Sequence, residues 1–296
     1  MKILITGGSG LLGKSLIETR KHGCEIVATY IGNYTMQDVD SIRYEKLDIR
    51  NKEDHDRLFK EFKPDVAIHT AGVGSPDYAE QHREESHNIN IGGARNILSC
   101  CEKHDSKLIF ISSNGIYDGE KAPYSEEDRA KPINYYGEIK LKTEEMIMDA
   151  GITHAIIRPI LMYGWNHPFE RSNIATYCLA RMTEGEKVSV YEDVFLTPLF
   201  SHSCAKAIWK VIEEDKYDIF NIAGAERSSI YQMIRKMADI FGLNSELIEP
   251  VRQGHFNELV KRPRDTSFRT TKMRDVLGIE PISLYEGFTA MKDCRK

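Results

Sequence analysis

The sequence lacks three features that would place it in a special class of protein. It holds no apolar run near the roughly 20 residues that a membrane-spanning helix needs. Residues 1–8 form a short apolar run that turns to glycine at once, which argues against a signal peptide or an anchor. The six cysteines include no Cys-x-x-Cys pair and no zinc-like spacing. We therefore predict a cytoplasmic protein in a reducing compartment, without a membrane segment.

The charge balance also lacks the basic excess that is typical of a nucleic-acid partner. Lys and Arg number 40 against 45 Asp and Glu, so the formal net charge is -5, whereas nucleic-acid binders usually gather basic residues on one face. His202 and Cys204 stand two residues apart, but no third ligand follows at a useful spacing, so no metal site is predicted. Neither a nucleic acid nor a membrane is expected as a partner.

What the sequence does hold, through its first half, is a regular alternation of short β-branched apolar runs and longer amphipathic stretches. This alternation is typical of βα units that build a parallel sheet. Strands are predicted at residues 2–6, 25–30, 43–48, 65–70, 107–112 and 154–158. Helices are predicted between them at residues 11–21, 52–62, 80–104 and 134–149.

Beyond residue 160 the rhythm becomes irregular, with short strands between the predicted helices at residues 174–184, 203–214, 229–241 and 271–277. We predict an α/β fold in which residues 1–160 form a Rossmann-type domain with a doubly wound parallel sheet. Residues 161–296 are predicted to form a smaller, mixed substrate-binding domain. No Pro- or Gly-rich linker separates the two parts, so we expect them to pack closely and to exchange some chain.

Three glycines follow the first predicted strand directly and open the first predicted helix. Gly7 permits a tight turn, Gly10 lets the backbone approach a pyrophosphate, and Gly13 allows close packing of the helix on the sheet. Free N–H groups at the helix start then face the anion. A glycine triplet alone also fits an ordinary turn, but in this context it predicts a dinucleotide site. The other loop residues predicted to contact the dinucleotide are Ser9, Leu11 and Leu12.

The end of the second predicted strand bears on which dinucleotide binds. An acidic residue normally binds the adenosine 2′-hydroxyl of NAD there, but this strand ends in Thr29 and Tyr30. No carboxylate repels a 2′-phosphate and no arginine binds one, so NADPH is favoured and NAD stays possible. Asp48, beside Ile49 at the end of the third strand, is expected to hydrogen-bond the adenine, although such a residue is as often a helix cap.

Tyr136 and Lys140 lie one helical turn apart, so both side chains leave the same face of the predicted helix. Tyrosine titrates near pH 10, and a nearby lysine charge favours the phenolate, which suits acid–base chemistry closer to neutral pH. The lysine can also bind a nicotinamide ribose. Tyr117 and Lys121 show the same spacing, but glycine and proline between and after them predict a loop, so that match is discarded.

A hydroxyl at the end of a neighbouring strand would complete this constellation by holding a substrate carbonyl against the tyrosine. Ser112 and Ser113 follow the fifth predicted strand and are the candidates. Each of them alone also fits a turn or cap residue. Together with Tyr136 and the glycine loop, they predict a catalytic site.

These residues together resemble the extended short-chain dehydrogenase/reductases, and within them the dTDP-4-dehydrorhamnose reductase-like branch. The resemblance covers nearly the whole chain and rests on the glycine loop, on Tyr136 with Lys140, and on the segments at residues 68–72, 88–96, 112–119, 156–164 and 262–272. It aligns Ser113 with the catalytic hydroxyl. It further implies a homodimer, cofactor contacts at Ala71, Gly72, Arg158 and Pro159, and substrate contacts at Asn114, Leu161 and Arg262.

Departures from the superfamily narrow the chemistry that the resemblance implies. Dehydratases carry an acidic pair where this chain has Asn114 and Gly115, and the epimerase-reductases that make GDP-fucose carry a cysteine at position 115. Leu161 replaces a tryptophan of the rhamnose-type reductases, so the exact sugar stays open.

The resemblance implies an enzyme of deoxysugar biosynthesis, an NAD(P)H-dependent reductase of a nucleotide-linked 4-keto-6-deoxysugar. The nicotinamide would deliver the hydride and Tyr136 the proton. Two alternatives stay open: a sugar-nucleotide epimerase of the same superfamily, and a non-catalytic NADP-binding regulatory subunit.

Overall fold

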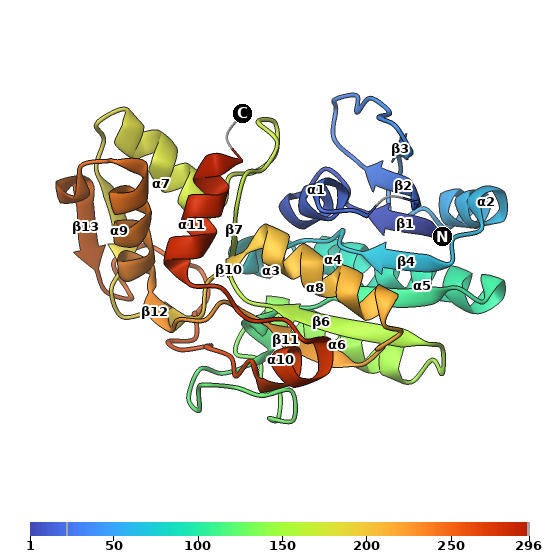
Figure 1. The fold of residues 1–296 in the computed structure, drawn as a ribbon. Helices are drawn as coiled ribbons and strands as arrows, with labels where there is room; N and C mark the ends of the chain where they lie inside the picture. The colour runs from blue at the N-terminus through green and yellow to red at the C-terminus, as the bar shows by residue number, and fades with distance from the viewer. Residues whose placement is uncertain (22, 295–296) are drawn as a thin grey trace.

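A parallel sheet of seven strands forms the centre of the computed structural model, which describes residues 1–21 and 23–294 (Figure 1). The strands lie in the order β3-β2-β1-β4-β5-β6-β11. Their bounds are β1 Lys2–Thr6, β2 Glu25–Tyr30, β3 Ile42–Lys46, β4 Val66–His69, β5 Lys107–Ile111, β6 His154–Pro159 and β11 Ile219–Ile222. The predicted α/β fold with a Rossmann-type doubly wound sheet is confirmed.

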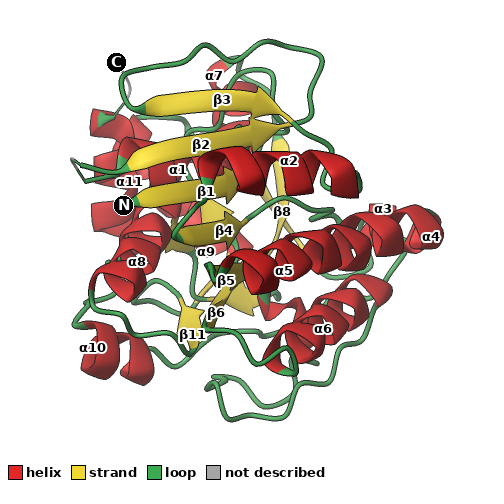
Figure 2. Ribbon diagram, turned by 90° about the vertical axis from the view of Figure 1, so that its right-hand side faces the viewer, coloured by secondary structure: helices red, strands yellow, loops and turns green. Residues whose placement is uncertain are grey.

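Helices cover both faces of this sheet, which explains why its inner strands are apolar almost throughout (Figure 2). On one face lie α2 (Lys52–Phe62), α5 (Gly93–His104) and α6 (Tyr135–Met148), whose apolar side chains pack on Leu4, Val27 and Leu108. On the other face lie α1 (Leu11–Glu18) and α8 (Ser201–Glu213), which share a core with Ile3, Ile5 and Ile109.

Most of the remaining elements gather beyond the carboxyl ends of the sheet strands, toward which the strand arrows point in Figure 1, whereas α10 (Thr271–Leu277) packs beside β11 and α8. The helices beyond the strand ends are α7 (Ile174–Thr183), α9 (Ile230–Phe241) and α11 (Leu284–Asp293). Short strand pairs join them, namely β8 (Val188–Tyr191) with β13 (Ile248–Val251), β7 (Met162–Tyr163) with β10 (Leu199–Phe200), and β9 (Phe195–Leu196) with β12 (Ser228–Ser229). The carboxyl ends of parallel strands are where α/β folds bind ligands, so this packing encloses the expected site.

The structure differs from the sequence prediction in three elements. β11 and α11 were not predicted, and the first of them adds a seventh strand to the sheet beside β6. The single helix expected at residues 80–104 is a series of shorter pieces, α3 (Pro76–Gln81), α4 (Arg83–His87), a π-helical turn (Asn88–Gly92) and α5. Ser75 and Pro76 explain the early start, because serine caps the helix and proline fits its first turn.

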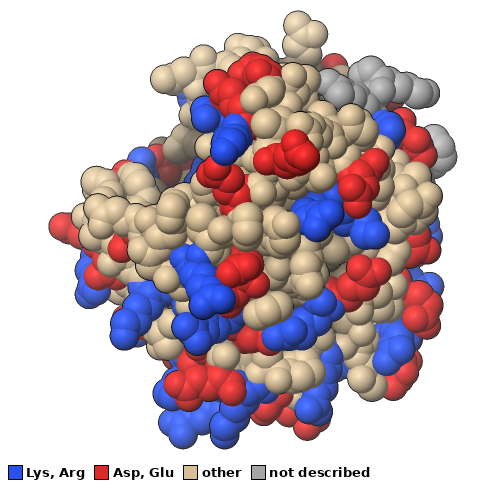
Figure 3. All heavy atoms as spheres, turned by 90° about the vertical axis from the view of Figure 1, so that its left-hand side faces the viewer, with Lys and Arg blue, Asp and Glu red and all other residues tan. Residues whose placement is uncertain are grey.

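The surface bears charges of both signs. Figure 3 shows Lys and Arg side chains intermixed with Asp and Glu over the face formed by the C-terminal elements. No helix within residues 1–21 and 23–294 is both long and apolar enough to cross a membrane. The predicted division of the chain into two domains at residue 160 stays a prediction. The last two residues of the predicted second domain, 295–296, lie outside the described part of the chain.

Candidate active site

A cavity of about 450 Å³ lies over the glycine loop, at the carboxyl ends of β1, β2 and β4. Gly7 adopts a left-handed φ of +71°, and a Cβ on Gly13 would lie 2.2 Å from the Gly7 carbonyl oxygen, so the loop and α1 depend on both glycines. A Cβ on Gly10 would meet only that carbonyl oxygen, at 3.4 Å. Gly10 is therefore not needed for packing within the chain, and its missing side chain leaves room for a ligand over the start of α1.

The far end of this cavity is lined by the side chains predicted for the adenosine half of a dinucleotide. Tyr30, Asp48 and Ile49 line it together with Arg50. Arg50 binds Asp48 through both carboxylate oxygens, at 2.6 to 3.0 Å. These hydrogen bonds hold the pKa of Asp48 below its usual range. Asp48 is thus an ionised acceptor that lines the cavity and could accept a hydrogen bond from an adenine amino group.

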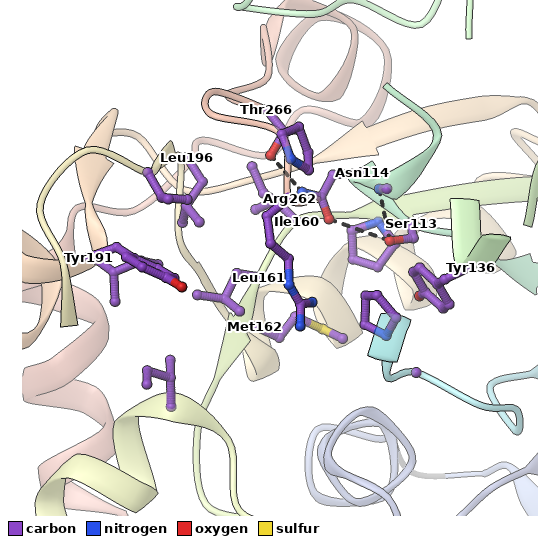
Figure 4. A pocket seen from close by; sticks show the side chains of 18 of the residues that line it. Ser113, Asn114, Tyr136, Ile160, Leu161, Met162, Tyr191, Leu196, Arg262 and Thr266 are labelled. Atoms are coloured by element: carbon purple, nitrogen blue, oxygen red, sulfur yellow. Dashed lines mark hydrogen bonds between the residues drawn. The ribbon is translucent and has the colours of Figure 1, made fainter. Parts of the chain in front are cut away.

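A second, larger cavity of about 850 Å³ adjoins the first, and five residues line both of them: Thr70, Gly72, Val73, Ile111 and Met162. The predicted catalytic residues Ser113, Tyr136 and Lys140 all line the larger cavity, and Figure 4 shows Ser113 and Tyr136 near each other. They lie next to the boundary between the cavities, because Ile111 lines both cavities, Ser113 follows Ile111 by two residues, and Lys140 donates to the Ile111 carbonyl oxygen. A nicotinamide ring would lie at such a boundary if its adenosine half occupied the first cavity.

Two glycines bring Tyr136 close to Ser113. A Cβ on Gly115 would lie 3.1 Å from the Tyr136 ring, and a Cβ on Gly137 would lie 2.2 Å from the Gly115 carbonyl oxygen. Asn134 begins α6 by accepting the Gly137 N–H at 3.0 Å, which fixes Tyr136 in the first helical turn. Backbone packing, with no side chain in between, thus sets the position of the phenol.

Ser113 has the cap role that its sequence context allowed, while its catalytic role stays a prediction. Its Oγ accepts the Gly115 N–H at 3.0 Å and so caps a short 3₁₀ turn. Burial raises the pKa of Tyr136, and the neighbouring Ser113 hydroxyl only partly opposes this shift. The phenol is therefore protonated at neutral pH.

Lys140 is a buried cation that faces the same cavity. Its Nζ donates to the Ile111 carbonyl oxygen at 2.9 Å and lies 5.0 Å from the centre of the Phe110 ring. Burial lowers its pKa to about 8. The sequence predicts that the lysine charge lowers the pKa of Tyr136. In the structure the ammonium instead donates to a carbonyl oxygen, and burial is the main influence on the pKa of the phenol, which it raises.

The predicted substrate residues Asn114, Leu161 and Arg262 line the larger cavity as well. Asn114 donates to Thr266 Oγ1 at 2.6 Å, which ties the catalytic loop to the C-terminal half of the chain. Arg262 binds Asp77 at 2.6 Å and Glu258 at 3.2 Å. Its guanidinium thus bridges α3 and the C-terminal segment across the cavity mouth.

Arg158 is the predicted cofactor residue that the structure does not bring to either cavity. Its guanidinium donates three hydrogen bonds to the buried carboxylate of Glu144, at 2.6 to 3.2 Å, and one to the Tyr117 hydroxyl at 3.0 Å. Strand alternation turns Arg158 toward α6, away from the ligand side. Its neighbour Pro159 does line the larger cavity, and Ala71 and Gly72 line the smaller one.

The sequence analysis missed several residues of the site. Thr266 and Tyr191 line the larger cavity and Glu170 lines the smaller one, all from the part of the chain beyond residue 160. No spacing or motif marks them, because they come from loops and a short strand that only the tertiary fold brings to the site. Within the described ranges, no group of three or more His, Cys, Asp or Glu side chains is placed to hold a metal ion.

The family described as RmlD substrate binding domain matches residues 1–294. The chain belongs to the RmlD substrate binding domain family. This membership confirms the resemblance drawn from the glycine loop and the catalytic segments, and it agrees with the extended short-chain dehydrogenase/reductase class.

The curated proteins that this chain resembles over most of its length carry different names. The chain is 25% identical to methionine adenosyltransferase 2 subunit beta of Danio rerio, over 94% of this chain and 85% of that protein. It is also 25% identical to the dTDP-4-dehydrorhamnose reductase of Aggregatibacter actinomycetemcomitans, over 95% and 94% of the two chains. The crystal structure of a dTDP-4-dehydrorhamnose reductase from Clostridium acetobutylicum shares the fold, with a TM-score of 0.86, 24% identity and 99% coverage of both chains.

Proposed function

We propose that this protein is an NAD(P)H-dependent reductase of a nucleotide-linked 4-keto-6-deoxysugar. The observation that carries the proposal is that Ser113, Tyr136 and Lys140 line one cavity beside the wall that it shares with the cavity over the glycine loop. The family assignment supports the class of NAD(P)-dependent oxidoreductase.

The residues of the smaller cavity fit a nicotinamide dinucleotide. Gly10 leaves open space over the start of α1, where no side chain caps the free N–H groups. In the larger cavity, next to the shared residue Ile111, Ser112 adds a buried hydroxyl without a hydrogen-bond partner. The glycine loop would hold the pyrophosphate, Asp48 the adenine and Lys140 the nicotinamide ribose. When bound, the reduced cofactor supplies the hydride.

The protein's own residues position the carbonyl and supply the proton. Ser113 donates a hydrogen bond to the substrate oxygen and holds it beside Tyr136. The phenol of Tyr136 is protonated because burial raises its pKa, so it can donate a proton to that oxygen. The charge of Lys140 then stabilises the phenolate that remains. These groups contribute position and charge, which is the usual share of a protein in cofactor chemistry.

The larger cavity suits a nucleotide-linked sugar. Its walls are mostly apolar, with Leu196, Val190 and Ile230 among them, which fits the flat face of a base and the methyl group of a 6-deoxysugar. Arg181, Lys187 and Arg262 also line it, each paired with a carboxylate, so a diphosphate would bind these cations by replacing their present partners.

Tyr136→Phe tests the proposed chemistry. The variant keeps the ring that packs on Gly115 but lacks the proton donor, so we expect a loss of about 10² to 10⁴ in kcat. Cofactor binding should change little. The measurement is loss of reduced-nicotinamide absorbance with a panel of nucleotide 4-keto-6-deoxysugars. Undiminished turnover by the variant would refute the role of Tyr136.

A regulatory subunit is the second candidate, and one comparison favours it. This chain is 25% identical to methionine adenosyltransferase 2 subunit beta of Rattus norvegicus, over 94% of this chain and 83% of that protein. A regulatory protein would bind the cofactor tightly yet oxidise it with none of the sugars, and it would change the activity of a partner enzyme. An epimerase would instead interconvert sugars without net cofactor oxidation.

The choice between NADPH and NADH is a finer point of this proposal. The sequence favoured NADPH because β2 does not end in a carboxylate. In the structure, the carboxylate of Glu170 lines the same cavity as the end of β2. The cytoplasmic location and the homodimer remain proposals. Sedimentation of the purified protein checks the dimer.

A further inference from the structure

Glu170 lies in the loop between β7 and α7, about 140 residues away from β2 in the sequence, yet its side chain lines the cofactor cavity. Its Oε1 accepts a hydrogen bond from Ser9 Oγ at 2.6 Å and another from the Tyr34 hydroxyl. The Tyr34 and Ser9 hydroxyl oxygens themselves lie 2.8 Å apart. A carboxylate from the C-terminal half of the chain is therefore fixed directly against the glycine loop.

The position of Ser9 shows which part of a dinucleotide this carboxylate would meet. The preceding residue, Gly8, donates its N–H to the Thr29 carbonyl oxygen at 2.7 Å, and its added Cβ would lie 2.6 Å from Ala28 Cβ. Ser9 thus lies on the β2 side of the glycine loop. In a Rossmann-type domain the adenosine ribose binds there, between the loop and the end of β2.

Aromatic packing holds the carboxylate in this place. The Tyr34 ring lies between Tyr30 and Phe169, with ring centres 5.5 and 4.0 Å away. Phe169 is the immediate neighbour of Glu170. The segment after β2 and the segment after β7 are therefore packed against each other beside the ribose position.

The charges that line the cofactor cavity favour a ribose without a phosphate. Among its described lining residues, the carboxylates are Asp48 and Glu170, and the lone cation is Arg50, which is bound to Asp48. A 2′-phosphate would thus approach Glu170 without an unpaired cation to offset the repulsion. A 2′-hydroxyl would instead donate to the carboxylate, which can accept about four hydrogen bonds.

We propose that Glu170 is the residue that selects NADH over NADPH, replacing in space the carboxylate that the end of β2 lacks. This inference rests on the proposed function only in assuming that the smaller cavity binds a nicotinamide dinucleotide. It reverses the preference for NADPH that the sequence of β2 favoured.

The test measures binding rather than turnover. NADH and NADPH are titrated separately into the full-length protein, and the fluorescence of the reduced nicotinamide gives each Kd. We expect the unmodified protein to bind NADH at least about tenfold more tightly than NADPH, a ratio that corresponds to about 1.4 kcal/mol. Glu170→Gln should reduce this ratio by about tenfold or more, because it removes the charge and keeps the shape.

Two further variants make the result specific. Glu102→Gln makes the same chemical change on the exposed surface of α5 and should leave the ratio unchanged. Tyr34→Phe keeps the carboxylate and should retain most of the preference for NADH. Each variant is melted without ligand to confirm that it is folded like the unmodified protein.

Tighter binding of NADPH by the unmodified protein would overturn the inference. The inference would also be overturned if Glu170→Gln left the preference for NADH unchanged, or if Tyr34→Phe abolished that preference as completely as Glu170→Gln does. Failure of the proposed function looks different, because a protein that binds NADH through Glu170 but reduces no nucleotide sugar keeps the inference and loses the reductase.

Discussion

Lys140 illustrates how a residue placed for chemistry is costly to the fold. Its side chain is 8% exposed, and no carboxylate forms a salt bridge with its ammonium among the described residues. Burial lowers its pKa to about 8, well below the ordinary lysine value of about 10.4. Folding is therefore less favourable at neutral pH than it would be with a neutral side chain at this position.

Lys140→Met tests this cost through the pH dependence of stability. Between pH 8 and about 10.4 the unfolded protein holds a proton on Lys140 that the folded protein has lost, so the free energy of unfolding rises with pH. The variant lacks this contribution. We expect the unmodified protein to gain about 2 kcal/mol relative to the variant between pH 7 and pH 9.5, measured by urea unfolding. A difference that stays constant with pH would contradict a lowered pKa.

At the scale of residues, the sequence predicted best where one helix or one loop carries the feature. Tyr136 and Lys140 share a helix, so their proximity follows from local structure, and Ser113 could be predicted because it comes just after a strand. Arg158 shows the opposite case, because its partner Glu144 is on another element and no spacing reveals the pair. Glu170 reaches the cavity only through the tertiary fold.

At the scale of elements, the join between β1 and α1 offers a matched pair of substitutions. Gly13→Ala places a Cβ 2.2 Å from the Gly7 carbonyl oxygen and 2.6 Å from Gly8 Cα, so backbone has to move. We expect Gly13→Ala to lower the free energy of unfolding by about 1–3 kcal/mol or more, which is the usual cost of overpacking a core.

Gly10→Ala makes the same chemical change three residues earlier, where the added Cβ meets only one atom, at 3.4 Å. Its melting temperature should stay close to that of the unmodified protein, while affinity for the dinucleotide falls because the methyl group occupies the space above the helix start. Thermal melting and cofactor titration of both variants check this contrast. Equal stability of the two variants would show that the packing at Gly13 is more tolerant than described.

Of the two elements that were not predicted, the helix α11 has a start that can be recognised in the sequence. Ser283 and Glu286 form a capping box, with Ser283 Oγ accepting the Glu286 N–H at 3.2 Å and Glu286 accepting the Ser283 N–H at 2.8 Å. Gly287 weakens the helical pattern because glycine lowers helix propensity. The structure explains the glycine, since a Cβ there would lie 1.9 Å from the Tyr163 hydroxyl.

At the scale of the whole molecule, the C-terminal half returns to complete the sheet. β11 pairs with β6 in register from Ile156 to Pro159, and α8 packs on α1. The Trp209 Nε1–H donates to the Leu16 carbonyl oxygen at 3.1 Å, in a buried position. A strand of four residues such as β11 has no local signal that shows which sheet it joins. The sequence could therefore predict the central sheet, but not that β11 adds to its edge beside β6.

A fragment of residues 1–160 tests how far the two halves depend on each other. It would lack α8 and expose the apolar sheet face that Trp209 and Ile208 cover, together with the edge of β6. We expect the fragment to aggregate or to unfold without cooperativity. Circular dichroism during heating is the measurement, and a sharp, reversible transition would show that the first half is an independent domain.

The wall shared by the two cavities has a kinetic consequence. Gly72, Ile111 and Met162 border both, so a dinucleotide in the first cavity would form part of the floor of the second. Under the proposed function, this arrangement predicts a compulsory order in which the dinucleotide enters first and leaves last. The oxidised dinucleotide should then inhibit competitively against the reduced one and non-competitively against the sugar, and a random order would give a different inhibition pattern.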